Sequence, residues 1–177
     1  MTQTVLRASG NAIVLSMVLA MGSSRLVWAA PGDCETMTAA SAASVLGVAK
    51  AKSNPSQTHQ RLPPDNMDVF GCGYVEISSD PMARTMSYLV YTPIAKDLAT
   101  VFSSLSHPNI PGKPQSFSPG IGTGSTGWVR LNATETFDGS IVFRRATDIV
   151  VVRVSGMPSG DAAKSALVKA GNILSKS

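Results

Sequence analysis

The sequence contains few of the residues on which catalytic and metal sites depend. Its 177 residues include two histidines, His59 and His107, two cysteines, and only 15% charged residues. Neither histidine stands in an HExxH or comparable ligand spacing, so a first-row metal ion would find almost no donors. We therefore expect no metal site and no cofactor.

The chain also lacks a long apolar run and a large excess of either charge. Its one apolar run near the N-terminus, residues 12–21, is about half as long as the roughly 20 residues that cross a bilayer. Beyond residue 29 there are 13 basic and 11 acidic residues, which gives a net charge of +2. That charge is too small for electrostatic binding of nucleic acid, and 44% hydrophobic residues are too many for a disordered chain. The composition predicts a globular domain with neither a nucleic-acid partner nor a stable membrane anchor.

Residues 1–29 have the layout of a secretory signal peptide. A basic residue precedes the apolar run, acidic residues are missing, and Val27 and Ala29 occupy the positions that a signal peptidase reads. We expect cleavage after Ala29 or Ala30, and a retained anchor is the weaker alternative because the apolar run is short. Residues 30–177 then form a single exported domain, periplasmic or secreted, that is long enough to bury its own core.

Two cysteines remain in the exported part. An even number of cysteines in an oxidising compartment predicts a disulfide, and Cys34 and Cys72 allow only one pairing. Closing the 39-residue loop between them contributes about 4 kcal/mol in the chain-entropy description. Lipid attachment at Cys34 is not expected, because Pro31-Gly32-Asp33 is not the small and apolar triplet that lipoprotein processing requires.

Hydrophobic periodicity predicts both helices and strands. Helices are expected at 38–50, where Gly47 interrupts or ends the helix, from Thr92-Pro93 to residue 105, and from Ser159 or Asp161 to the C-terminus. Strands 73–79 and 84–92 are expected to form a hairpin. Strands 128–137, 140–145 and 148–155 are expected to form a meander, with turns at Asp138-Gly139 and Ala146-Thr147. Two segments are expected to be loops, the proline-rich 51–68 and the glycine-rich 106–127.

The last predicted strand indicates how the domain is layered. Residues 149–152 are apolar at every position, which is typical of a central strand covered on both faces. The expected order is α-β-β-α-β-β-β-α. This order predicts the α+β class, with an antiparallel sheet of about five strands and helices packed on it.

Two short motifs approach known catalytic or nucleotide-binding patterns but lack their context. Ser125 has Thr123 where a GxSxG elbow needs glycine. Residues 122–127 satisfy GxGxxG, but a long loop precedes them and a strand is expected after them, whereas a dinucleotide site needs a strand before and a helix after. We interpret these glycines as residues that permit tight turns and positive φ values in a loop that folds back onto the sheet.

Basic and aromatic residues of the predicted meander are candidates for a binding surface. Arg130, Arg144 and Arg145, with Arg153 on a neighbouring strand, would form an anion-binding patch if they converge on one sheet face. The alternative is that they lie on a strand face exposed to solvent. For the tryptophan the alternative is packing within the sheet. The candidate binding residues, including loop glycines, are Arg130, Arg144, Arg145, Trp128, Gly120, Gly122 and Gly124.

Several short blocks carry a resemblance to a known family. Cys34-Glu35-Thr36-Met37-Thr38 leads to Ala42-Ala43-Ser44-Val45-Leu46-Gly47, and Gly71-Cys72-Gly73-Tyr74 follows. These two blocks, and Pro119-Gly120-Ile121-Gly122 before the last strands, resemble a bacterial cell-envelope family of unknown function, best known as actinobacterial lipoproteins. The resemblance implies a disulfide between the two cysteines, a helix-and-sheet fold similar to the PsbP and Mog1 type, and no catalytic residues. The chain departs from that family by lacking its lipid-attachment cysteine.

These features predict a non-enzymatic binding module of the cell envelope. Its partner is expected to be a protein or another envelope component, bound through the sheet face and the 106–127 loop. Two alternatives stay open. One is a small secreted hydrolase that uses His107 or His59 with one of the serines, and the other is an inhibitor of secreted enzymes that presents the loop as a rigid plug.

Overall fold

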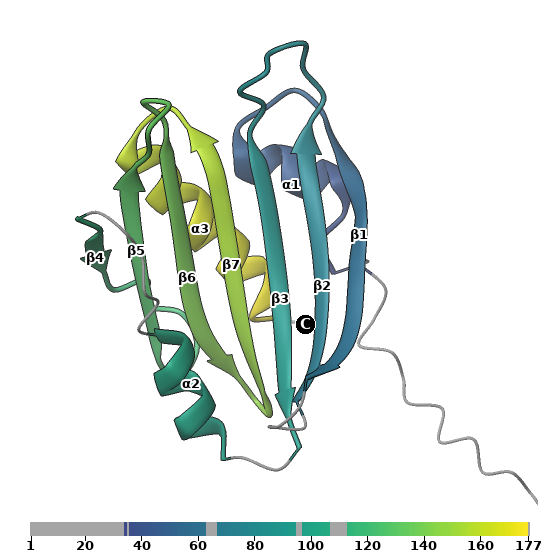
Figure 1. Cartoon of the computed structure of the whole chain (residues 1–177), viewed down its shortest axis with the longest axis vertical. Coiled ribbons are helices and arrows are strands. Elements are labelled where there is room, and N and C mark those ends of the chain that lie inside the picture. Colours follow the sequence, from purple (N-terminus) through teal and green to yellow (C-terminus); the bar gives the residue numbers. More distant parts are fainter. Residues whose placement is uncertain (1–33, 35, 63–66, 95–96, 107–112, 177) are drawn as a thin grey trace, which may run out of the picture. The chain divides into compact units, whose positions relative to one another are not determined.

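Every strand of the sheet runs antiparallel to its neighbours. The computed structural model describes residues 34–176 except 35, 63–66, 95–96 and 107–112, without the side chains of 55–62, and the expected signal peptide lies outside the described residues. The sheet belongs to the unit formed by residues 31–177 and has the order β1-β2-β3-β7-β6-β5-β4 (Figure 1). Its strands are β1 (Ala51–Leu62), β2 (Met67–Glu76), β3 (Thr85–Pro93), β4 (Gln115–Phe117), β5 (Ser125–Leu131), β6 (Phe137–Arg145) and β7 (Asp148–Met157).

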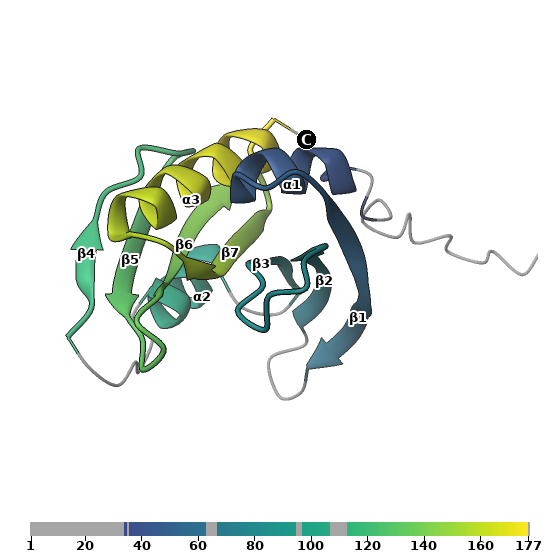
Figure 2. The same ribbon diagram turned by 90° about the horizontal axis from the view of Figure 1, so that it is seen from above.

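Helices lie on both faces of this sheet. Helices α1 (Ala39–Leu46) and α3 (Gly160–Leu174) pack side by side on one face, and α2 (Leu98–Ser106) packs against β6 and β7 on the other (Figure 2). We call these faces the α1/α3 face and the α2 face. They bury two separate hydrophobic clusters, of which the one beneath α1 and α3 is larger.

Strand β7 lies in the middle of the sheet and is buried from both sides. Val150 and Val152 belong to the cluster beneath α1 and α3, whereas Ile149 and Val151 pack with Val101 of α2. Each of the four β7 side chains is at most 4% exposed. The sequence prediction of a central strand covered on both faces is therefore confirmed.

The structure confirms the α+β class but contains more strands than the expected five. The observed order is α-β-β-β-α-β-β-β-β-α, with seven strands. The expectation of a loop over 51–68 is wrong for 51–62, which form the edge strand β1. Pro55 argued against a strand because proline has no backbone N–H to donate to a neighbouring strand. In the structure Pro55 lies between Asn54 and Thr58, where the register of the β1–β2 pairing shifts and a bulge tolerates proline.

The glycine-rich segment is also partly strand. The described residues from 113 onward include β4, which pairs with β5, and β5 itself begins at Ser125 rather than at 128. The remaining part of the expected loop, residues 107–112, lies outside the described residues.

The first predicted turn of the meander is misplaced. Asp138 and Gly139 lie within β6, and the chain turns at 132–136 instead. Asn132 Oδ1 accepts the backbone N–H groups of Thr134 (3.0 Å) and Thr136 (3.1 Å), a local side-chain turn for which asparagine is well suited. The second predicted turn, Ala146-Thr147, is confirmed between β6 and β7.

Helix ends follow their capping groups. Gly47 ends α1 with φ 66°, and the Ser159 side chain, not that of Asp161, caps α3 by accepting the Ala162 N–H (3.1 Å). The expected start of α2 at Thr92-Pro93 is wrong, because those residues belong to β3, where the Thr92 hydroxyl donates to Asp148 Oδ1 (2.8 Å).

Helix α2 begins instead after Asp97. The Asp97 carboxylate accepts the hydroxyl (2.6 Å) and the backbone N–H (2.8 Å) of Thr100, and these hydrogen bonds lower the pKa of Asp97. No helix in the described part of the chain is long and apolar enough to cross a membrane.

The disulfide between Cys34 and Cys72 is present, with Cα atoms 5.9 Å apart. Cys72 is buried in β2, so the bond fixes the segment before α1 to the sheet. The buried Tyr74 hydroxyl, on the same strand, binds the carbonyl oxygens of Cys34 and Met37. Two neighbouring interactions thus hold one short segment.

Replacing both cysteines, Cys34→Ala with Cys72→Ala, is expected to lower the free energy of unfolding by about 4 kcal/mol. The chain-entropy description assigns this loss to the freed 39-residue loop. Tyr74→Phe alone should cost about 1–3 kcal/mol, because it leaves buried carbonyl oxygens without their donor. Urea unfolding measures both changes.

A triple variant provides the control. Since the disulfide and the Tyr74 hydroxyl hold the same segment, the combined loss should be smaller than the sum of the separate losses. Strictly additive losses would contradict the shared role.

Candidate functional site

The three candidate arginines do not share one site. Arg145 lies on the α1/α3 face, where it donates to the Leu174 carbonyl at the end of α3 (3.1 Å) and pairs with Asp148 (3.2 Å). Arg130 and Arg144 lie on the α2 face, but the cross-strand partner of Arg130 is six positions from Arg144 along β6. At roughly 3.3 Å per residue this separates them by about 20 Å.

Arg144 fastens α2 to the sheet. Its guanidinium lies over the ring of Phe102 in α2, 4.6 Å from the ring centroid, a cation–π contact. The positive charge of Arg144 also contributes to lowering the pKa of Asp97, the residue that caps this helix. Arg144 therefore acts in the attachment of α2.

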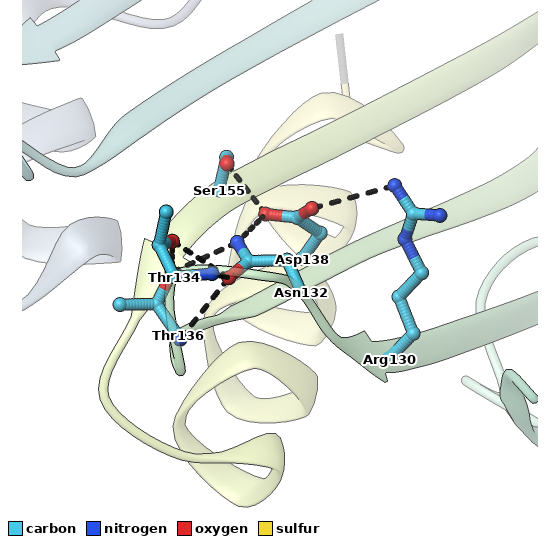
Figure 3. Close-up of polar contacts among 6 residues, drawn as sticks. All are labelled: Arg130, Asn132, Thr134, Thr136, Asp138 and Ser155. Atoms are coloured by element: carbon cyan, nitrogen blue, oxygen red, sulfur yellow. Dashed lines mark hydrogen bonds and ion pairs between the residues drawn. The ribbon is translucent and has the colours of Figure 1, made fainter. Parts of the chain in front are cut away.

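Arg130 belongs to a polar cluster at the opposite end of the sheet. It pairs with Asp138 at 3.6 Å, and the same carboxylate accepts hydrogen bonds from the Asn132 side-chain amide (3.0 Å) and the Ser155 hydroxyl (Figure 3). Thr134 and Thr136 complete the cluster around Asn132 (Figure 3). These contacts tie the β5–β6 turn to β7, which is a structural role.

Between these two arginines lies a cleft that the sequence did not reveal. It has a volume of about 130 Å³ and separates the C-terminal part of α2 from strands β5, β6 and β7. We call it the α2 cleft. Its lining residues are Ser104, Leu105, Trp128, Ser140, Val151 and Arg153.

Three of these residues form a row across the cleft. Trp128, Ser140 and Arg153 are cross-strand partners on β5, β6 and β7, so neighbours in the row are roughly 4.8 Å apart. Ser140 therefore stands between an indole and a guanidinium. Leu105 and Val151 supply the apolar part of the lining.

Ser140 has an unusual environment. It is 3% exposed and is the one buried polar or charged residue among those the structure describes. Its hydroxyl makes no hydrogen bond with any described residue. Because Ser140 also lines the α2 cleft, its hydroxyl is available to a ligand.

Arg153 is the charged member of the row. Its side chain is exposed, and it makes no hydrogen bond or ion pair with another residue in the described ranges. Its field reaches Tyr91, a residue of β3: burial raises the pKa of Tyr91, and the charge of Arg153 opposes that rise. Of the residues that the sequence analysis named for a binding surface, Trp128 and Arg153 line the α2 cleft. Ser140 was missed because a lone serine in a strand resembles a solvent-facing position.

The candidate glycines serve the backbone of the segment before β5. Gly120 and Gly122 have positive φ values, 69° and 63°, whereas Gly124 does not. A Cβ at Gly122 would collide with the carbonyl oxygen of Arg144, and the Arg144 N–H donates to the Gly124 carbonyl (3.1 Å). The segment thus folds back onto β6, as we expected, and a strand rather than a helix follows it.

Two pockets on the opposite face are lined by Lys169 and Arg84, which make structural contacts, and by Lys176. One pocket has a volume of about 580 Å³ and lies along α3, and the other has about 250 Å³ and lies between α1 and α3. Lys169 donates to the Ser44 carbonyl (2.9 Å) and hydroxyl (2.8 Å), and Arg84 donates to the carbonyls of Leu46 (2.9 Å) and Gly47 (3.1 Å). Lys169 and Arg84 therefore satisfy carbonyl groups at the C-terminal end of α1.

The two histidines are not brought to the α2 cleft by any described contact. His59 lies in β1, four strands from β6, which is about 19 Å at roughly 4.8 Å per strand. His107 lies outside the described residues. In the described ranges no three histidine, cysteine or acidic residues are grouped so as to hold a metal ion.

Comparison of the chain with protein-family models, with curated proteins and with solved structures finds no match. The resemblance of the cysteine blocks to an envelope family is therefore neither supported nor contradicted. The α2 cleft has to be interpreted from its own residues.

The fold-back of the glycine segment can be tested by adding one methyl group at two nearby positions. Gly122→Ala is expected to lower the free energy of unfolding by about 1–3 kcal/mol, because it combines a strained positive φ with a backbone collision. Gly124→Ala is the control, since its Cβ would enter open space at an ordinary φ, and it should change stability by less than about 0.5 kcal/mol. Equal losses in thermal or urea unfolding would contradict the interpretation.

Proposed function

We propose that this chain is an exported, non-enzymatic binding module whose recognition surface is the α2 cleft. The observation that carries the proposal is the buried residue Ser140, whose hydroxyl has no hydrogen-bond partner among the described residues and which stands between Trp128 and Arg153. An aromatic ring, an unpaired guanidinium and an unused hydroxyl in one row are typical of a surface that recognises another molecule.

The size of the cleft indicates the kind of partner. Pockets that enclose small molecules usually have volumes of about 300–1,000 Å³, whereas the α2 cleft has about 130 Å³. It accommodates one side chain or one terminal group. The partner is therefore a protein or another large envelope component that inserts a single group while most of it stays outside.

The covalent framework supports an exported location. The disulfide between Cys34 and Cys72 supports folding in an oxidising environment, such as the periplasm or the extracellular medium. This agrees with the signal peptide expected over residues 1–29. Recognition in the cleft, rather than in the 106–127 loop, is favoured because Gly122 and Gly124 serve the attachment of that segment to β6.

The proposal can be tested by blocking the cleft from its rim. Ser104→Trp places a large ring over the cleft without removing a buried side chain, because Ser104 is exposed on α2. Immobilised wild-type protein should retain a component from an envelope extract of the organism that makes it. The blocked variant should retain at least tenfold less of that component.

Ser103→Trp is the matched control. Ser103 is the neighbouring exposed serine on α2 but does not line the cleft, so this variant should retain the component as the wild type does. Circular dichroism and melting temperature verify that both variants are folded. Equal retention by the blocked variant and the wild type would contradict recognition through the α2 cleft.

A further inference from the structure

The chemistry of the α2 cleft also indicates which group it receives, an inference that rests on the proposed function. We propose that the cleft binds a carboxylate attached to an apolar group, presented by the partner. The carboxylate would lie against Arg153 and Ser140, and the apolar group against Trp128, Leu105 and Val151.

The polar groups of the cleft favour a hydrogen-bond acceptor with a negative charge. Arg153 has only donors, and its guanidinium matches the planar geometry of a carboxylate. The Ser140 hydroxyl beside it has no acceptor among the described residues. A carboxylate has two oxygens, so it can accept from both groups at once.

Neighbouring charges favour a monoanion over a dianion. Arg130 lies two residues from Trp128 along β5, but it already pairs with Asp138 (3.6 Å). Asp138 lies two residues from Ser140 on the same face, and its negative charge opposes a second negative charge in the ligand. Arg144, at the other end of the α2 face, is stacked on Phe102. Among the residues that the structure describes, one unpaired cation thus faces the cleft, which suits a carboxylate better than a phosphate group.

The apolar lining favours a ligand with a hydrophobic part next to its charge. Leu105 of α2 and Val151 of β7 contribute aliphatic surface, and the half-buried ring of Trp128 presents a flat surface opposite Arg153. A small hydrophilic anion would leave this lining unused. Two sources fit, the C-terminal carboxylate of a chain that ends in an apolar residue and an acidic side chain beside one.

Fluorescence of Trp128 offers a direct test in the full chain. Trp128 is the one tryptophan beyond residue 29, and a Trp28→Phe background makes it the sole indole of the chain. Acetyl-leucine is expected to change its emission with saturation in the millimolar range. Acetyl-leucinamide, which has the same shape without the charge, should bind at least tenfold more weakly.

Further probes distinguish the source of the carboxylate. Acetyl-glutamic acid α-amide carries its carboxylate on the side chain. If it binds more tightly than acetyl-leucine, the site receives an acidic side chain. If it binds more weakly, the site receives the C-terminal carboxylate of a chain. Both results support a carboxylate site. Inorganic phosphate should not compete at tenfold higher concentration, and competition would overturn the choice of carboxylate.

Variants assign the roles within the cleft. Arg153→Gln should reduce the preference for acetyl-leucine over its amide to less than twofold, and Ser140→Ala should weaken binding of acetyl-leucine about three- to tenfold. Lys176→Gln on the other face removes the same charge and should change nothing. An undiminished preference in Arg153→Gln would overturn the inference.

The failure of this inference is distinguishable from that of the proposed function. If acetyl-leucine and its amide bind equally and Ser104→Trp abolishes both in a calorimetric titration, which its added indole does not disturb, the cleft is a recognition site but not one for carboxylates. If none of the probes changes the emission while the envelope component is still lost in Ser104→Trp, the carboxylate inference is again overturned and the binding module stands.

Discussion

The burial of β7 on both faces is the constraint on which the other features of this domain depend. The antiparallel pairing of β3 with β7 joins two meanders, β1–β3 and β4–β7, into one sheet, so neither meander exposes an edge at this junction. Val150 and Val152 pack beneath α1 and α3, and Val151 packs beneath α2. A polar residue at any of these positions would separate a helix from the sheet.

The two faces of the sheet use their polar residues differently. On the α1/α3 face, Lys169, Arg84 and Arg145 satisfy carbonyl groups at helix ends, so these cations maintain the fold. On the α2 face the helix covers only part of the sheet. At its C-terminal end Ser140 and Arg153 lie beside a cleft without partners among the described residues, which supports a role in recognition.

The sequence predicted those features that depend on local pattern. The apolar run of β7, the start of α3 at Ser159 or Asp161 and the cysteine pair were identified from residue types alone. Strand β1 was missed because its polar composition and Pro55 conceal an edge strand, and the β5–β6 turn was misplaced because Asp138-Gly139 has the composition of a turn but pairs within β6. The α2 cleft could not be predicted, because it depends on where α2 lies over the sheet. The start of α2 was also misplaced, because Thr92-Pro93 has the composition of a helix start but pairs within β3.

Mapping a bound carboxylate onto the backbone tests most directly the claim that the two faces have different tasks. In a nitrogen–proton correlation spectrum of the labelled protein, saturating acetyl-leucine should shift the amides of Ser140, Arg153 and Leu105 and the indole N–H of Trp128. The amides of Lys169 and Asn172 in α3 should stay in place. Shifts that cluster on α3, or that spread evenly over both faces, would contradict the account.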